Sequence, residues 1–151
     1  MMPMMLSASP LSASPAPEPA PSRPGGGKEK AAAAACLARR RRDTVVRCVA
    51  AALGVPMRDI RGARRGTARQ VEARQIGIYL LHVVFSVPLN VTGPLFGKDR
   101  TTAAHACQRI EERRDDAAFD AFMHDLELAV SALDSAVSYR TNSELKEAGA
   151  W

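Results

Sequence analysis

The sequence predicts an all-helical fold: a small helical domain with a helix-turn-helix, preceded by a disordered tail rich in proline, alanine and serine. Apolar residues recur at helical spacing through most of the chain after Asp43. Most prolines lie in the first 30 residues, which hold no large apolar residue after Leu11. The 151 residues allow one modest domain beside such a tail. We therefore expect a tail with a basic end over residues 1–42, a folded domain over 43–136 and a frayed C-terminal segment over 137–151.

The tail carries too little apolar surface to offset the entropy lost on ordering, which is typical of a disordered segment. It also lacks the basic start and sustained apolar run of a signal peptide. Its end, residues 30–42, reads KAAAAACLARRRR, with high helix propensity but no clear amphipathic stripe. This end fits a nascent helix or a basic arm. The run Arg39–Arg42 fits non-specific phosphate binding as well as it fits a solubilising surface.

The first helix of the folded domain is expected to be capped by Asp43 and ended by Gly54, with Pro56 following. Its apolar face is Val45, Cys48, Val49 and Ala52. Residues 54–68 are expected to form a basic loop. Residues 69–87 are apolar on most sides after Gln75, which indicates a central, buried helix. A buried strand is the alternative for its Ile/Val-rich half, but the length favours a helix.

Pro88 interrupts the central helix, and residues 89–97, LNVTGPLFG, are expected to form one short helical piece or turn. Asp99 is a good N-cap for a further helix that runs to about Arg114. Its apolar face is narrow and made mostly of small residues: Ala103, Ala106, Cys107 and Ile110. Such a helix packs closely against another element. Its opposite face is short, polar and able to hydrogen-bond, with Thr101, His105, Gln108 and Glu112, as in a helix inserted into a DNA major groove.

The last helix is expected over residues 117–136. Its apolar stripe consists of Phe119, Phe122, Leu126, Val130 and Leu133. Its other faces are acidic, so it should lie away from DNA. The charge of the chain is segregated accordingly: residues 1–114 hold 19 basic and 8 acidic residues, and residues 115–151 hold 2 and 8. A basic body with a basic tail, in a chain whose pI is near 9.6, suggests a polyanionic partner such as nucleic acid, although a solubilising surface would look the same.

Other classes of protein are disfavoured by the residues present. The three cysteines are widely spaced without a CxxC pair, which favours reduced thiols in a cytoplasm over disulfides or zinc. The strongest apolar run, residues 76–87, is too short to span a bilayer. Cys107 and His105 lie two positions apart on a helix and point to different faces, so they do not form a catalytic pair. The histidines lack metal-ligand spacing. We expect no enzyme activity, no metal and no cofactor.

A resemblance to a known family makes the expected function more specific. Residues 73–111 resemble the C-terminal DNA-binding domain of the bacterial replication initiator DnaA, and the likeness extends from about residue 43 to 134. The family reads R-Q-x-A-M-Y-L in its central helix, then F-G and D-H-T-T-V-x-H-A-C-x-K-I-E. The matching positions are Arg74, Gln75, Leu80, Phe96, Gly97, Asp99, Thr101, Thr102, His105, Ala106, Cys107, Ile110 and Glu111. This run is far more specific than a generic helix-turn-helix pattern.

The resemblance implies that the helix after Asp99 enters the major groove, while a basic loop before the central helix reaches the adjacent minor groove. It assigns base or phosphate contacts to the start of that helix, backbone contacts to His105 and Arg109, and phosphate clamps to Arg74, Gln75 and Lys98. The full set of implied DNA-binding residues is Arg64, Arg65, Arg74, Gln75, Pro88, Leu89, Lys98, Asp99, Arg100, Thr101, Thr102, His105 and Arg109.

This chain departs from the family pattern at several positions. The signature histidine of the family is Arg100 here, and arginine prefers guanine in bidentate geometry, so base preference can shift. One glycine before the basic residue is absent. The Ile-Gly pair of the turn helix is Thr92-Gly93. The minor-groove arginine would align near Gly66, where Arg64 and Arg65 are close enough to substitute.

The resemblance implies sequence-specific binding of double-stranded DNA at DnaA-box-like sites, with a role in regulating replication initiation. Neither GPLFGKD nor PGGGKE has Walker A spacing, so we expect a stand-alone domain without ATPase activity. The initiator itself is a further expected partner; a membrane and a small-molecule substrate are not. The expected location is the cytoplasm, with the nucleoid. The alternatives are a transcriptional regulator, a non-specific nucleoid-type DNA binder and an adaptor that docks on the initiator.

Overall fold

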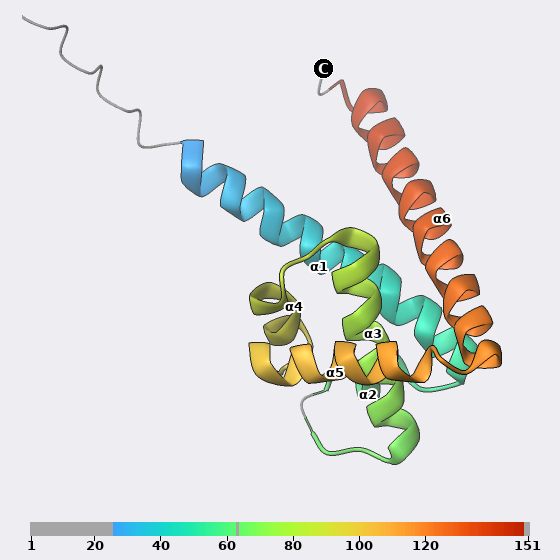
Figure 1. The fold of residues 1–151 in the computed structure, drawn as a ribbon. Helices are drawn as coiled ribbons and strands as arrows, with labels where there is room; N and C mark the ends of the chain where they lie inside the picture. The colour runs from blue at the N-terminus through green and yellow to red at the C-terminus, as the bar shows by residue number, and fades with distance from the viewer. Residues whose placement is uncertain (1–25, 63, 150–151) are drawn as a thin grey trace, which may run out of the picture.

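The computed structural model describes residues 26–62 and 64–149 and confirms an all-helical fold, with no strand in those ranges. The described part of the chain forms six helices: α1 (Gly26–Leu53), α2 (Met57–Arg61), α3 (Ala68–Phe85), α4 (Leu89–Leu95), α5 (Arg100–Arg113) and α6 (Ala117–Glu147). Figure 1 shows α3 in the middle of the body, with α1, α2, α4 and α5 around it and α6 along one side.

The central position of α3 follows from its sequence. Ile76, Ile78, Leu80 and Leu81 are almost wholly buried, because successive apolar residues face different neighbouring helices around the axis. The helix begins with a capping box in which the Thr67 side chain accepts from the Gln70 backbone and the Gln70 side chain accepts from the Thr67 backbone. The expected central helix is thus confirmed, and the strand alternative is wrong.

The α4–α5 pair is held at close range by a glycine. A Cβ atom on Gly93 would lie 2.7 Å from the Asp99 carbonyl oxygen and 2.9 Å from that of Lys98, so no larger residue fits without a backbone shift. The Gly93 carbonyl accepts from the Lys98 N–H at 2.9 Å. Gly97 turns the chain with a φ of 65°. These contacts set the angle at which α5 leaves α4, which is the geometry of a helix-turn-helix.

The N-terminal part of α1 corrects one expectation. Residues 26–42, which we placed in the disordered tail, are helical, so of the two interpretations of residues 30–42 the helix holds. Residues 1–25 lie outside the described residues. The arginine run at the end of this segment packs against the body, which orders that part of the helix. The Arg41 guanidinium lies 4.8 Å from the Phe85 ring centroid and forms an ion pair with Asp134 at 3.7 Å. Arg40 donates to the Ser138 hydroxyl at 3.1 Å. Asp43 accordingly lies inside the helix and is not its cap.

Two further boundaries differ from the sequence-based expectation. The 54–68 segment includes the short helix α2, because Ile60 is fully buried in the core. Pro56 is the N-cap of this helix, a place where the missing N–H of proline costs no helical hydrogen bond. Gly54, with a φ of 64°, ends α1 as expected. At the other end, α6 continues over residues 137–147, where we expected fraying. Arg140 and Glu144 form an (i, i+4) ion pair in this extension at 3.5 Å, a pairing that supports an exposed helix.

The two long helices extend beyond the body. In Figure 1 the start of α1 and the end of α6 diverge from each other. The two helices contact each other nearer their middles, where Arg40 meets Ser138 and Arg41 meets Asp134. None of the helices in the described ranges has the length and apolar character needed to cross a bilayer.

Candidate nucleic-acid interface

The helix α5 presents one face to the core and one to solvent, as its sequence predicts. Ala103, Ala106, Cys107 and Ile110 are buried, whereas Thr101 and His105 are exposed. Burial, with a smaller contribution from the charge of Glu111, raises the pKa of the Cys107 thiol to about 11. That thiol is therefore protonated at neutral pH, in keeping with a packing residue.

Asp99 fixes the start of α5. Its carboxylate accepts from the Thr102 backbone N–H at 2.6 Å and from the Thr102 hydroxyl at 3.2 Å. The backbone hydrogen bond from Thr102, followed by that hydroxyl, lowers the pKa of Asp99. The N-cap predicted from the sequence is thus confirmed. Because Asp99 engages the Thr102 hydroxyl, Thr101 and Arg100 are the first-turn side chains that face solvent without a partner in the described part of the chain.

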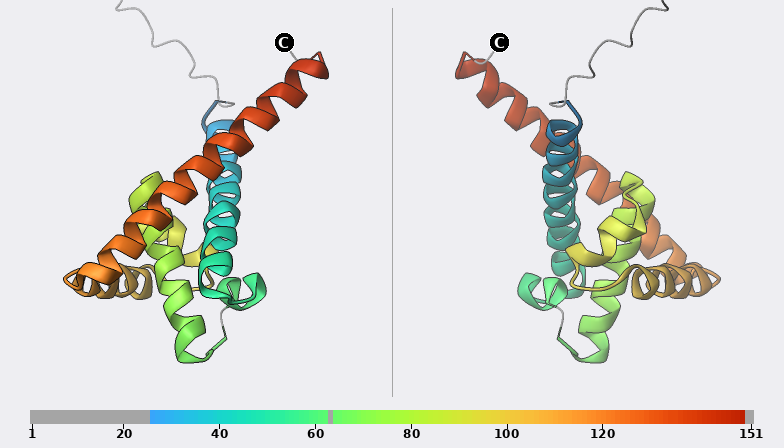
Figure 2. Two further views of the ribbon diagram at one scale, coloured as in Figure 1. Left: turned by 90° about the vertical axis from the view of Figure 1, so that its right-hand side faces the viewer. Right: turned by 90° about the vertical axis from the view of Figure 1, so that its left-hand side faces the viewer.

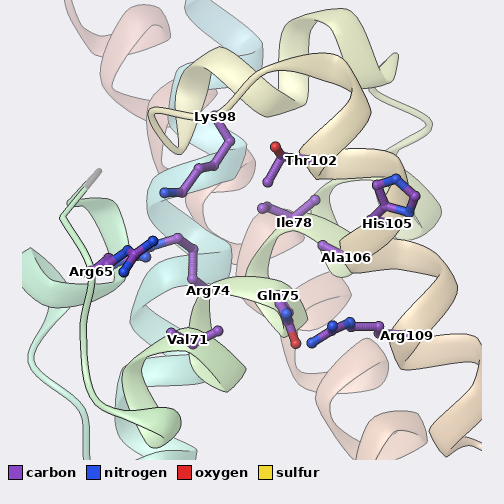
Figure 3. A pocket seen from close by; sticks show the side chains of 10 residues that line it. All are labelled: Arg65, Val71, Arg74, Gln75, Ile78, Lys98, Thr102, His105, Ala106 and Arg109. Atoms are coloured by element: carbon purple, nitrogen blue, oxygen red, sulfur yellow. The ribbon is translucent and has the colours of Figure 1, made fainter.

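A groove opens between α3, the α2–α3 connection and the solvent face of α5. Its floor is apolar, with Val71, Ile78 and Ala106, and its rim is polar and basic (Figure 3). In the close-up, Arg65, Arg74 and Lys98 extend toward one side, while the ends of Gln75 and Arg109 lie near each other at the other. The sequence-predicted residues that line this groove are Arg65, Arg74, Gln75, Lys98, Thr102, His105 and Arg109.

Arg74 has a structural task within this groove. Its guanidinium donates to the Asp59 carbonyl oxygen at 2.7 Å and to the Ile60 carbonyl oxygen at 3.2 Å, and the residue is only 6% exposed. Burial lowers the pKa of Arg74, and the charge of Asp59 partly opposes that shift. The side chain thus ties α3 to α2. It thereby positions the connection that carries Arg64 and Arg65, a task that the sequence did not indicate.

The other predicted residues lie around the groove rather than in it. Arg64 lines an adjoining hollow that shares Arg65 and Arg74 with the main groove. Arg100 and Thr101 stand on the exposed first turn of α5. Pro88 is the N-cap of α4, and Leu89 begins that helix and packs partly against the core. Pro88 borders a separate apolar hollow between α1 and the start of α4, so this pair is not brought to the groove.

The C-terminal end of α5 is anchored by two arginines, Arg113 and Arg114, that no sequence pattern indicated. Arg114 donates to the Tyr79 hydroxyl at 3.0 Å, to Asp120 at 2.6 Å and to Glu127. Burial lowers the pKa of Arg114, but these hydrogen bonds outweigh it and raise the pKa above its usual range. Arg113 pairs with Glu72 at 2.7 Å and covers the Phe119 ring. Both guanidinium groups are therefore occupied within the fold.

The described residues offer no cluster of three or more histidine, cysteine or carboxylate side chains that could hold a metal ion. The features that distinguish this surface are instead its cationic rim, its exposed hydroxyl and imidazole groups, and the exposed first turn of α5.

Comparison with known proteins gives the same picture. Residues 42–110 match the family described as the bacterial DnaA protein helix-turn-helix. The chain is 39% identical over 70 residues to the chromosomal replication initiator protein DnaA of Picosynechococcus sp., covering 45% of this chain and 15% of the relative. It is 34% identical over 71 residues to the chromosomal replication initiator protein DnaA 1 of Protochlamydia amoebophila, covering 47% and 16%.

A solved structure of a DNA replication initiation factor resembles this fold with a TM-score of 0.58 and 30% sequence identity, covering 69% of this chain and 31% of that one. The resemblance to the C-terminal domain of DnaA that the sequence indicated is thereby confirmed. The matches span less than a sixth of the length of the two replication initiators.

Proposed function

We propose that this chain binds double-stranded DNA at DnaA-box-like sites and regulates the initiation of chromosomal replication without ATPase activity. One observation carries the proposal: the helix-turn-helix presents the exposed first turn of α5 directly beside a groove rimmed by Arg65, Lys98 and Arg109. Cations near a recognition helix attract and position the phosphates, and the helix reads base edges.

In the proposed complex α5 enters the major groove with its N-terminal turn foremost. Arg100 and Thr101 then face base edges, because N-terminal residues of a recognition helix make such contacts. The intervening phosphate backbone crosses the groove on the rim formed by Gln75, Lys98 and His105. The connection before α3 places Arg64 and Arg65 beside the neighbouring minor groove.

The proposed link to replication rests on the relatives, which are named as chromosomal replication initiators. A protein that reads the same sites can compete with the initiator or assist its loading. A protein that binds such sites in promoters would instead be a transcriptional regulator. A genome-wide binding map distinguishes the two, because replication control requires occupancy of the origin.

The decisive experiment is fluorescence anisotropy of labelled duplexes across a salt series, with one duplex carrying a DnaA box and one carrying the same bases scrambled. We expect a preference for the box that persists at physiological salt. Equal binding to both duplexes, collapsing as salt rises, would instead show a non-specific binder. No binding to either duplex would favour an adaptor.

Three variants give the assay residue-level resolution. Thr101→Ala should lower discrimination between box and scrambled duplex by about 1–3 kcal/mol if the contact is to a base edge. Arg65→Ala should weaken binding to both duplexes and reduce the salt slope by about 1 for a lost phosphate contact. Arg140→Ala is the matched control, because its side chain is 77% exposed on α6, remote from the groove. If the control weakens binding as much as Arg65→Ala does, the groove is not the binding surface.

A further inference from the structure

The outer face of α6 is not covered by any other helix of residues 26–62 and 64–149. In the left view of Figure 2, α6 crosses in front of the body with no element over it. Its inner face is buried through Met123, Leu126 and Val130. The outer face nevertheless carries Leu128, which is 58% exposed, and Tyr139, which is 78% exposed. These two large apolar side chains lie on the same helix face, which makes that face a candidate contact surface.

Four residues form a stripe along this face: Leu128, Ala132, Ser135 and Tyr139, hereafter the outer stripe. Their spacings of four, three and four residues are those of the core positions of a coiled coil. The order of sizes is large, small, small, large, so it reads the same in both directions. Two α6 helices packed antiparallel would place Leu128 of one copy against Tyr139 of the second. Ala132 would then meet Ser135, and a twofold axis would pass between positions 133 and 134.

The polar groups near the axis are already satisfied. The Ser135 hydroxyl donates to the Ser131 carbonyl oxygen at 3.0 Å, and the Ser131 hydroxyl donates to the Glu127 carbonyl oxygen at 2.9 Å. Covering these side chains therefore leaves no hydroxyl donor unpaired, which removes the usual cost of burying serine. Small side chains at the centre also allow the two helix backbones to approach closely.

Charge selects the antiparallel orientation. Asp125 is exposed toward the N-terminal end of α6 and Lys146 toward its C-terminal end, both on the side of the outer stripe. An antiparallel pair directs Asp125 of one copy toward Lys146 of the second, one turn beyond the residue opposite it. A parallel pair would instead place Asp125 beside Asp125. Opposite charges in register favour one orientation, and like charges disfavour the other.

From this pattern we propose that the outer stripe of α6 is the interface of an antiparallel homodimer, with a second copy of this chain as its occupant. The contact runs along residues 121–146, roughly 39 Å of helix at about 1.5 Å per residue. Only the layer of Leu128 and Tyr139 and its symmetry mate contain large apolar side chains, so the dimer is in equilibrium with monomer. The dimer presents two copies of the helix-turn-helix, but the assembly itself does not depend on DNA binding.

The first test is sedimentation equilibrium of the full chain without DNA, over a concentration series into the high micromolar range. Leu128→Glu and Tyr139→Glu should each raise the dimer dissociation constant at least tenfold, or about 1.4 kcal/mol. Val83→Glu is the matched control, since Val83 is a 44% exposed apolar residue on α3. A chain that is monomeric throughout overturns the proposal. So does a dimer that the control disrupts as strongly as the stripe variants do.

The orientation is tested by disulfide trapping in a Cys36→Ser background, because Cys36 is the exposed native cysteine. Ala132→Cys and Ser135→Cys chains are oxidised separately and as a mixture, with a purification tag on one of them. An antiparallel pair should cross-link the mixture faster than either chain alone, because position 132 faces position 135 of the second copy. Faster cross-linking within each separate chain would overturn the antiparallel arrangement. Failure of this dimer would leave the DNA-binding proposal intact, and the reverse also holds.

Discussion

Two groups of arginines that look alike in the sequence are used differently by the fold. Arg41, Arg42 and Arg74 have their guanidinium groups engaged inside the molecule, by Asp134, by Asp43 and by backbone carbonyls of α2. Arg65 and Arg100 stand exposed at or beside the groove next to α5. The first group, the inner arginines, stabilises the helices that carry the surface. The second group, the outer arginines, belongs to that surface.

The difference shows that the local density of charge does not identify a binding patch. The densest basic run of the chain is Arg39–Arg42. Three of its four guanidinium groups contact other helices. The outer arginines are dispersed in sequence and become neighbours only through the packing of α3 and α5. What separates the groups is whether a carbonyl or carboxylate of the same chain already accepts a hydrogen bond from the guanidinium or forms an ion pair with it.

The largest effect should come from Arg74→Met, because Arg74 is the most buried of the inner arginines. The Asp59 and Ile60 carbonyl oxygens would lose their donor in an apolar setting, at about 2–4 kcal/mol of unfolding free energy. Denaturant unfolding followed by circular dichroism measures this loss. Arg69→Met, an exposed arginine in the first turn of the same helix, is the control and should change stability little. Equal effects of the two variants would show that the α2 contacts do not matter.

Arg100→His probes an outer arginine for specificity rather than stability. If Arg100 reads a guanine, the change should cost about 1–3 kcal/mol at one base pair and leave other positions unaffected. Binding to a library of box variants with each position randomised measures this. Thermal unfolding should be unchanged, because the side chain is exposed. A uniform loss across all variants would instead indicate a phosphate contact.

Arg41→Ala should have an intermediate effect, on stability alone. The Asp134 carboxylate is left without its cation beside the core, and the ring contact to Phe85 is lost. We expect the free energy of unfolding to fall by about 1–2 kcal/mol. This figure is discounted for solvent screening, because the Arg41 side chain is 29% exposed. The double variant Arg41→Ala/Asp134→Ala should recover part of the loss, since no unpaired carboxylate remains. Additive losses would argue that the pair is not coupled.

Much of the fold followed from local patterns. The start of α5 at Asp99, its four-residue apolar face and the end of α1 at Gly54 were predicted, because caps and helical periodicity are properties of short segments. A nascent helix was one of two interpretations of residues 30–42, and the helical state of residues 137–147 was not predicted. The helical state of both segments depends on partners far along the chain, such as Asp134 for Arg41 and Ser138 for Arg40.

The residues of the candidate site likewise fall into those that local patterns predicted and those that depend on distant partners. Residues on α5 itself were placed well, because one helical wheel orders them. The task of Arg74 was missed, because its acceptors belong to a five-residue helix that the sequence presents as loop. The anchoring of α5 by Arg114 was missed for a related reason: two of its partners, Tyr79 and Glu127, lie 35 and 13 residues away. Only their packing around α3 makes them neighbours.

The smallest effect is expected for Arg39→Ala, which tests whether the inner group has an exposed exception. Arg39 is the exposed member of the run, and no contact engages it in the described part of the chain. Its removal should change the unfolding free energy by no more than about 0.5 kcal/mol. If the run binds phosphate, Arg39 is the residue that does so. Arg39→Ala should then slightly reduce the salt dependence of affinity for both duplexes. A loss confined to the box duplex would place Arg39 among the outer arginines, and proximity to bound DNA, rather than the absence of an internal acceptor alone, would then define that group.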